Sequence, residues 1–171
     1  EKIKKMEKII EKETVQRVKD FLNNFNPQIK IIVLSNSAST AKDASKLLKC
    51  EVGAIIKSLL IKTDNYFLIC LVAGDKRCSL KKIKKIINKK DVYMASADEV
   101  KKITGFSIGG VSPVGHVNQV DIFVDKSLSR FKNLFAAAGH PNSVFETNYN
   151  ELLKITKGYE KEISEWEKLG Q

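Results

Sequence analysis

A single lysine interrupts an apolar stretch at residues 55–61, Ile-Ile-Lys-Ser-Leu-Leu-Ile. In a strand over residues 54–62, alternate side chains share one face, so Lys57 would have Leu59 and Ile61 as its neighbours. An unpaired ammonium is costly to bury, and Lys57 must therefore find an anion, lower its pKa or open onto a pocket. The sequence favours a functional role for Lys57. The alternative is a lysine at an exposed strand edge that reaches water.

Two glycine turns could also carry chemistry. Residues 105–116 contain four glycines and one proline, and residues 136–143 contain Gly139 and His140. Such turns can direct backbone N–H groups at an anion or at a developing oxyanion. A merely tight connection explains either turn as well, and the spacing does not match the nucleotide-binding glycine loops. His116 and His140 are the only histidines, and a lone loop histidine is usually not a general base.

The charge balance predicts a polyanionic partner. The chain of 171 residues has 30 basic and 20 acidic side chains, a formal net charge of +10. Nucleic acid is the partner that this excess favours, although a lysine-rich composition also simply keeps a protein soluble. Arginine is scarce, so we expect a phosphate backbone to be held rather than a base sequence to be read. Six lysines at residues 81–90 form either a tRNA-backbone footprint or a solvated helix face.

Composition also limits the class of protein. No apolar run is long enough to cross a membrane and no secretory signal begins the chain, so we expect a cytoplasmic protein without membrane contact. Three cysteines without C-x-x-C spacing and two histidines make a metal site improbable, and no cofactor is predicted. Cys70 lies in an apolar stretch and is expected to be a core residue.

Hydrophobic spacing predicts one domain, residues 1–171, of α/β or α+β type around a mixed sheet. Serine caps are expected at Ser79 and Ser96, and Asn148 is expected to cap a further helix. Helices are predicted at 3–25, 40–49, 79–88, 96–105, 148–158 and 159–169. Strands are predicted at 29–34, 54–62, 66–73, 92–95, 120–124 and 132–137, with a hairpin turn at 63–65.

Four segments, in this order, resemble the YbaK/EbsC family: residues 40–44 (Thr-Ala-Lys-Asp-Ala), 55–59, 109–116 (Gly-Gly-Val-Ser-Pro-Val-Gly-His) and 137–139. That family contains the free-standing relatives of the prolyl-tRNA synthetase editing domain. The resemblance covers about residues 30–157 and leaves residues 1–25 as an N-terminal helical extension. It implies a barrel-like mixed β-sheet flanked by helices, working without metal.

The resemblance further implies trans-editing, which is hydrolysis of the ester between a wrong amino acid and the 3′ adenosine of a tRNA, often tRNA(Pro). Prolyl-tRNA synthetase is a second possible partner. Lys57 corresponds to the family lysine that engages the aminoacyl-adenosine end, Gly109 and Pro113 to a G-x-x-x-P loop, and Gly139 to the second glycine turn. Val144 stands where the cysteinyl-tRNA(Pro) branch has an acidic residue, so cysteine specificity is not implied.

An aminoacyl ester is already activated, so positioning a water and stabilising an oxyanion suffice without a nucleophilic triad. Our hypothesis assigns this work to Lys57, Gly109, Gly110 and Gly139. Substrate-binding positions are expected at Thr40, Ser58, Ser112, Pro113, His116 and His140. Two alternatives stay open: a tRNA- or synthetase-binding module without hydrolysis, and a hydrolase of another small ester. A DNA-binding regulator is least favoured, because no helix-turn-helix is evident.

Overall fold

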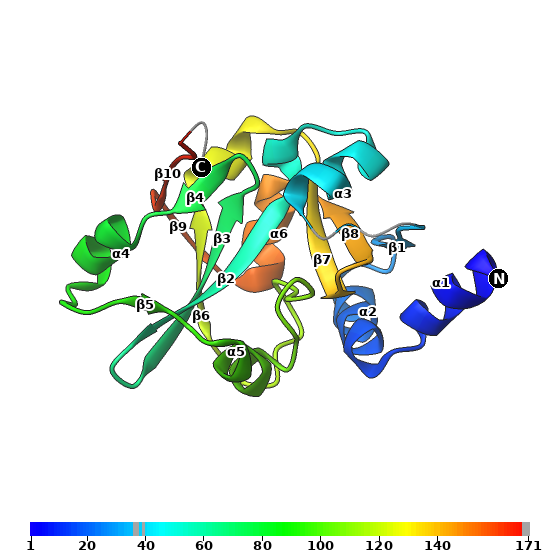
Figure 1. Ribbon diagram of the computed structural model, residues 1–171, viewed down its shortest axis with the longest axis horizontal. Coiled ribbons are helices and arrows are strands. Elements are labelled where there is room, and N and C mark those ends of the chain that lie inside the picture. The colour runs from blue at the N-terminus through cyan, green and yellow to red at the C-terminus, as the bar shows by residue number, and fades with distance from the viewer. Residues whose placement is uncertain (36–37, 39, 169–171) are drawn as a thin grey trace.

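The strands of the protein form three sheets in a computed structural model that describes residues 1–35, 38 and 40–168 (Figure 1). The largest sheet has the order β5-β2-β3-β6-β9, the second β1-β8-β7 and the third β10-β4. The first comprises β2 (Ile56–Thr63), β3 (Tyr66–Ala73), β5 (Tyr93–Met94), β6 (Asp121–Asp125) and β9 (Tyr159–Lys161). The others comprise β1 (Ile31–Val33), β4 (Lys76–Cys78), β7 (Leu134–His140), β8 (Ser143–Thr147) and β10 (Ser164–Trp166).

The hairpin that the sequence predicts is formed by β2 and β3, which lie between β5 and β6 in the largest sheet. Its two strands pair antiparallel from Ile56–Ala73 to Thr63–Tyr66. The turn between them is tight, and Asp64 adopts a positive φ of 39° there. Strand β6 then joins β3 in parallel, so the sheet is mixed. The mixed α+β class that we expected is therefore confirmed.

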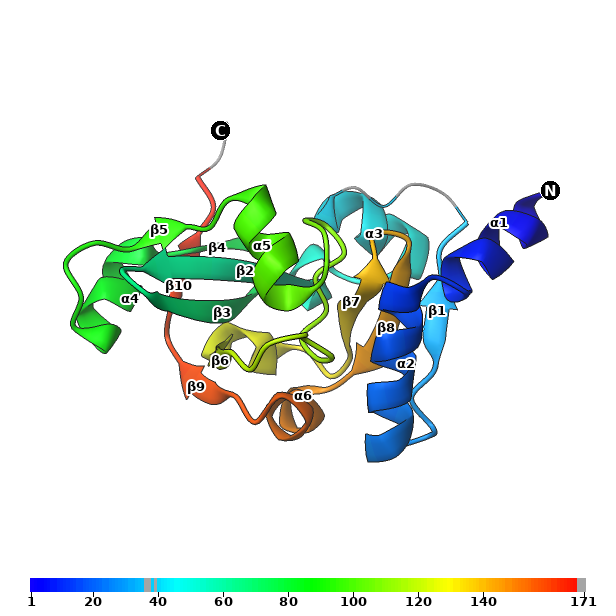
Figure 2. The same cartoon turned by 90° about the horizontal axis from the view of Figure 1, so that it is seen from below.

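Strand β3 separates two hydrophobic clusters. One cluster contains Leu71 together with residues of α2 (Glu13–Phe25), α5 (Ala97–Thr104) and α6 (Tyr149–Thr156). The other contains Cys70 together with Ile83 of α4 (Leu80–Ile87) and Ile163. Because neighbouring residues of a strand point to opposite faces, both faces of β3 are buried. Figure 2 shows α5 above the hairpin, α6 below it and α4 beside its left-hand end. Cys70 is fully buried, which confirms the core role expected for it.

Helix caps occur where the sequence predicts them. The side chains of Ser79 and Asn148 accept from the backbone at the first turns of α4 and α6. Ser96 and Glu99 form a complete capping box at the start of α5. Thr40 caps α3 (Ala41–Leu48) by accepting from the Asp43 N–H at 3.0 Å. These caps satisfy N–H groups that have no partner within the helix.

The N-terminal segment forms two helices rather than the single helix predicted at 3–25. They are α1 (Lys2–Ile10) and α2, separated by the extended backbone of Lys12. Helix α1 contains no buried residue, whereas α2 buries Val15, Val18 and Leu22. Tertiary packing therefore stabilises α2 as part of the core, and nothing comparable holds α1 on the same axis.

The prediction of a helix at 159–169 is wrong, because residues 159–168 contain the strands β9 and β10 instead. Residue 169, the last of the predicted helix, lies outside the described residues, as do residues 170–171. Strand β9 pairs with β6 and β10 pairs with β4. The charged composition favours a helix locally, but two open strand edges supply partners that the pattern does not reveal.

The barrel-like expectation also needs correction. Among the described residues the sheets stay separate, with a single parallel bridge between Ile55 and Phe135 joining two of them.

Candidate functional site

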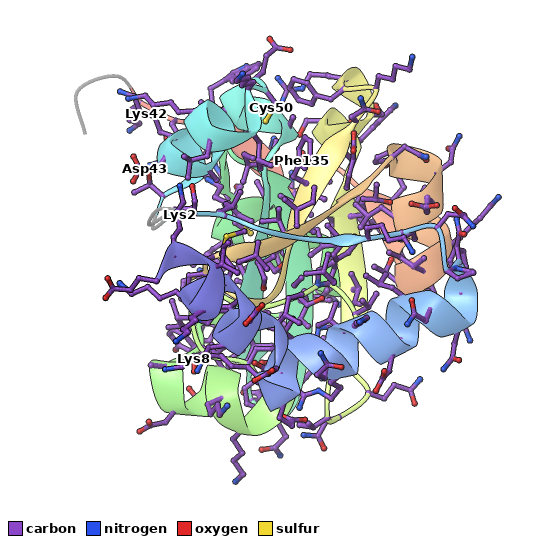
Figure 3. The ribbon with its side chains drawn as sticks, turned by 90° about the vertical axis from the view of Figure 1, so that its right-hand side faces the viewer. Lys2, Lys8, Lys42, Asp43, Cys50 and Phe135 are labelled. Carbon is purple, nitrogen blue, oxygen red and sulfur yellow. The ribbon has the colours of Figure 1, made fainter. Side chains whose placement is uncertain are left out.

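A cavity of about 380 Å³ lies between α3, β2, β5, α5 and the end of β7. Its walls are mostly apolar, including Ala44 from α3, Val100 from α5 and Val144 from β8. Figure 2 places α3, β2, β5 and α5 in the upper half of the molecule as drawn. Figure 3 shows Phe135, which also lines the cavity, on the inner side of α3, while Lys42 and Asp43 lie at its outer edge.

Four of the predicted site residues line this cavity: Thr40, Lys57, Ser58 and Gly109. Lys57 is opposite Val72 in the β2–β3 pair, and its side chain is 26% exposed. Its ammonium donates to the Lys76 carbonyl and to Glu167 Oε1 at 3.3 Å. The position of Lys57 in an apolar strand required an anionic partner, a lowered pKa or an opening onto a pocket. Lys57 has the anionic partner and also borders a pocket.

Ser58 faces the opposite side of β2 from Lys57. Its Oγ is buried, and it has no hydrogen-bond partner among the described residues. A buried hydroxyl without a partner is unusual in a folded protein and calls for an explanation. Because Ser58 is one of the residues that line the cavity, a molecule bound there is a candidate partner for this hydroxyl.

The two glycine turns are packed against each other. A Cβ on Gly110 would lie 3.0 Å from the Cα and N atoms of His140, so a larger residue there would push the two turns apart. The Gly110 N–H donates to the Ser107 carbonyl at 2.9 Å. Gly109 has a φ of +89° and lines the cavity, and its N–H makes no hydrogen bond to the described residues. Gly109 is therefore the member of this pair with a free donor at the cavity.

Ser112, Pro113 and His116 do not line the cavity of Lys57. Ser112 is fully buried, where its Oγ accepts from the Val114 N–H and its carbonyl lies 2.7 Å from His116 Nε2. Burial lowers the pKa of His116, and the nearby Arg17 charge adds to the effect. Pro113 and His116 instead line a second cavity of about 560 Å³, bordered by α2 and α6.

Gly139 and His140 lie beside the first cavity without lining it. Gly139 has a φ of +93°, and a Cβ there would be 2.5 Å from the Thr14 carbonyl oxygen. Gly139 thus permits close contact between β7 and α2. His140 Nδ1 accepts from the Asn142 N–H at 3.0 Å, and burial together with Lys12 lowers its pKa.

Sequence reasoning did not identify Arg17 or Glu167 as residues of this region. Arg17 donates from α2 to the carbonyls of Gly105 and Gly115, at 3.0 and 2.7 Å, and lies over the Phe106 ring. It therefore holds both ends of the first glycine turn. The apolar spacing of α2 signalled that this helix packs, but nothing local signals the contact between Glu167 and Lys57.

Within the described ranges, no group of three or more His, Cys, Asp or Glu residues is arranged to hold a metal ion. None of the helices in the described chain is long and apolar enough to cross a membrane.

Hydrogen bonding with Cys78 and burial raise the pKa of the Cys70 thiol. Cys70 is therefore a neutral thiol at neutral pH.

Comparison with known proteins relates this fold and site to a family. The sequence profile described as "Aminoacyl-tRNA editing domain" matches residues 35–155. The uncharacterized protein YwhH of Bacillus subtilis is 29% identical over 144 residues, which are 84% of this chain and 91% of that protein. Proline–tRNA ligase of Caldicellulosiruptor bescii is 27% identical over 135 residues, and this chain spans only 23% of the ligase.

A solved structure of a candidate trans-editing enzyme for prolyl tRNA synthetase is similar over nearly the whole chain. It has a TM-score of 0.85 and 32% sequence identity, and the match covers 90% of this chain and 98% of that one. A second structure, of the hypothetical protein APE2540, has a TM-score of 0.80 at 26% identity. With the profile matching most of its length, this chain belongs to the aminoacyl-tRNA editing domain family.

Proposed function

We propose that this protein is a trans-editing aminoacyl-tRNA deacylase, which hydrolyses the ester between a wrongly attached amino acid and the 3′ adenosine of tRNA(Pro). The observation that carries the proposal is the apolar cavity that has Lys57, the unsatisfied Ser58 hydroxyl and the free Gly109 N–H on its walls. Membership of the editing-domain family supports it.

The proposed reaction needs little from the protein beyond positioning. Water adds to the ester carbonyl, the bond from the acyl carbon to the ribose oxygen breaks, and the ribose oxygen takes a proton. Negative charge develops on the carbonyl oxygen, and the Gly109 N–H and the Ser58 hydroxyl are the unsatisfied donors available to stabilise it. Gly110 and Gly139 contribute by holding the two turns in place.

In this proposal Lys57 holds the terminal ribose or its phosphate. Its ammonium is already directed to two oxygens, the Lys76 carbonyl and the Glu167 carboxylate. A phosphate oxygen is the same kind of acceptor, so substrate binding would exchange Glu167 for the tRNA backbone. Thr40, at the cavity wall, would contact the substrate from α3, and His140 would act indirectly through Gly110.

The cavity walls favour a small, uncharged amino acid. Ala44, Ala137 and Val144 are apolar, and the Lys57 ammonium on the same walls is assigned to the ribose or phosphate in this proposal. Small apolar side chains differ by about 1–3 kcal/mol per methylene in such a pocket, so the shape of these walls would set the preference.

Deacylation of alanyl-, cysteinyl-, seryl- and prolyl-tRNA(Pro) tests the proposal. The protein should release one wrong amino acid and spare prolyl-tRNA(Pro), and Lys57→Ala should lose the activity without unfolding. Lys62→Ala is the matched control, because Lys62 lies on the same strand but pairs with Glu99 at 2.6 Å. It should keep the activity. Equal turnover by Lys57→Ala and the unchanged protein would remove Lys57 from the site.

The paired state of Lys57 favours one second candidate, a tRNA- or synthetase-binding module that performs no hydrolysis. Such a module would bind tRNA(Pro) or prolyl-tRNA synthetase tightly and leave every ester in the panel intact. The same panel, combined with a binding titration, therefore decides between the two functions.

A further inference from the structure

We propose that Trp166 is a stacking site for a nucleobase of the unpaired 3′ end of tRNA, beside the terminal adenosine. The inference rests on the proposed function and names how the same site would hold its RNA. Trp166 lies in β10, outside the residues 35–155 that match the family.

The indole of Trp166 is exposed and flanked by cations. It is 61% exposed, although tryptophan is a side chain that gains much from burial. The Lys76 ammonium lies 4.2 Å from the centre of the ring, and the Arg130 guanidinium lies 5.2 Å from it. Pairing of β10 with β4 places Trp166 directly opposite Lys76, so the arrangement is built into the sheet.

This indole is next to the cavity through two separate connections. Lys57, which lines the cavity, donates to the carbonyl of Lys76, the residue paired with Trp166. Lys57 also pairs with Glu167, the residue that follows Trp166. An RNA strand whose last nucleotide enters the cavity would therefore run past the indole. The nucleotides just before the last one would lie beside the ring.

Single-stranded RNA is the occupant that this chemistry fits. Proteins hold unpaired nucleotides by stacking bases on aromatic rings, while nearby lysines and arginines meet the phosphates. Two acidic side chains near the indole already have basic partners: Glu165 pairs with Arg77, and Asp75 pairs with Arg130. The Lys76 ammonium makes no ion pair among the described residues, although its charge helps to lower the pKa of Asp75, so it can still meet a phosphate.

The lysine-rich helix α4 extends this surface. Lys82 donates to the Ser164 carbonyl at 2.6 Å, which joins α4 to β10. The other lysines of residues 81–90 are exposed, and their ammonium groups make no ion pair within the described chain. A backbone leaving the indole toward α4 would stay in positive potential.

Fluorescence provides the first test, because Trp166 is the only tryptophan of the chain. The RNA ACCA should quench the emission of the unchanged protein in a saturable titration. Lys76→Ala should bind this RNA several-fold more weakly. An abasic ribose-phosphate tetramer, which carries the charges without the bases, should leave the emission unchanged. Absence of quenching by ACCA would overturn the inference. So would a result in which prolyl-tRNA synthetase quenches the emission and ACCA does not.

Kinetics provides the second test. Trp166→Ala should raise the KM for the mischarged tRNA about tenfold or more, the loss expected for one stacked base, and should leave hydrolysis of free aminoacyl-adenosine unchanged. Trp166→Phe should recover most of the loss. Tyr159→Ala is the matched control, because Tyr159 is 57% exposed and lines the second cavity instead.

Failure of the proposed stacking site can be distinguished from failure of the proposed deacylase function. Should the unchanged protein hydrolyse neither substrate, the proposed deacylase function is wrong, and the fluorescence titration still decides on RNA stacking. Should it hydrolyse both, with Trp166→Ala indistinguishable from it on tRNA, the stacking site is wrong and the deacylase function stands.

Discussion

The hydroxyl of Ser58 is a donor without a hydrogen-bond partner in the described part of the chain. Replacing it with hydrogen removes no hydrogen bond, so Ser58→Ala should leave the free energy of unfolding unchanged or raise it by up to about 1 kcal/mol. Deacylation should nevertheless fall about tenfold, because the substrate then has one hydrogen-bond donor fewer. Urea unfolding and kcat/KM on the same sample check both parts. A less stable variant with full activity would show that Ser58 is structural.

His116 should make the stability of the protein depend on pH. Burial holds the pKa of His116 below that of an unfolded histidine, about 6.5, so the unfolded chain takes up the proton first. This contribution is complete above about pH 6.5 and is lost as the pH falls toward the folded pKa. His116→Gln, which can still donate to the Ser112 carbonyl, should flatten the loss of stability between pH 7 and 5.

Unfolding in urea at a series of pH values measures this effect. His140→Gln is the comparison, because the pKa of His140 is shifted in the same direction but its ring is only half-buried. It should flatten the curve less. Curves that coincide for the unchanged protein and His116→Gln would show that another group titrates.

At the scale of the elements, the contact between α2 and β7 depends on a glycine. Gly139→Ala should destabilise the fold by about 2 kcal/mol or more, because the left-handed backbone is strained for alanine and the new Cβ meets the Thr14 carbonyl oxygen. Gly109→Ala has a similar φ but only the Pro141 ring nearby, at 3.5 Å, so it should lose about 1–2 kcal/mol. Chemical denaturation of the two variants gives the difference, and equal losses would show that packing against α2 adds nothing.

The sequence predicts those elements whose signals are local. Caps at Ser79 and Ser96, the hairpin at Asp64 and the apolar face of α2 depend on neighbouring residues, and all were found. The strands β9 and β10 were missed because their partners, β6 and β4, are distant in sequence. A charged segment such as 159–168 becomes a strand only when an open sheet edge is available.

The candidate site shows the same division. The lone lysine and the glycine turns are visible as composition, so Lys57 and Gly109 could be predicted. Their surroundings could not, because Glu167 reaches Lys57 through strand pairing and Arg17 reaches Gly115 through helix packing. The sequence likewise grouped His116 with Lys57, although the glycine loop carries His116 to a different cavity.

For the whole molecule, the net charge of +10 predicts that affinity for tRNA falls steeply with salt. Replacing both Lys84 and Lys85 of α4 by alanine should weaken binding. It should also reduce the slope of log affinity against log salt by about one unit for each phosphate that these lysines neutralise. Lys154→Ala, on the exposed face of α6, is the control. An unchanged slope in the α4 variant would show that its lysines serve solubility.

Strand β3 has a consequence for how the chain reaches its folded state. Residues 68–73, Leu-Ile-Cys-Leu-Val-Ala, are buried on both faces and carry no charge, which is the composition of an aggregation-prone segment. The hairpin turn lets β2 cover one edge early, but the other edge waits for β6, which follows only after α4, α5 and the glycine loop. During synthesis that edge is open, so slow production at low temperature should increase the soluble yield.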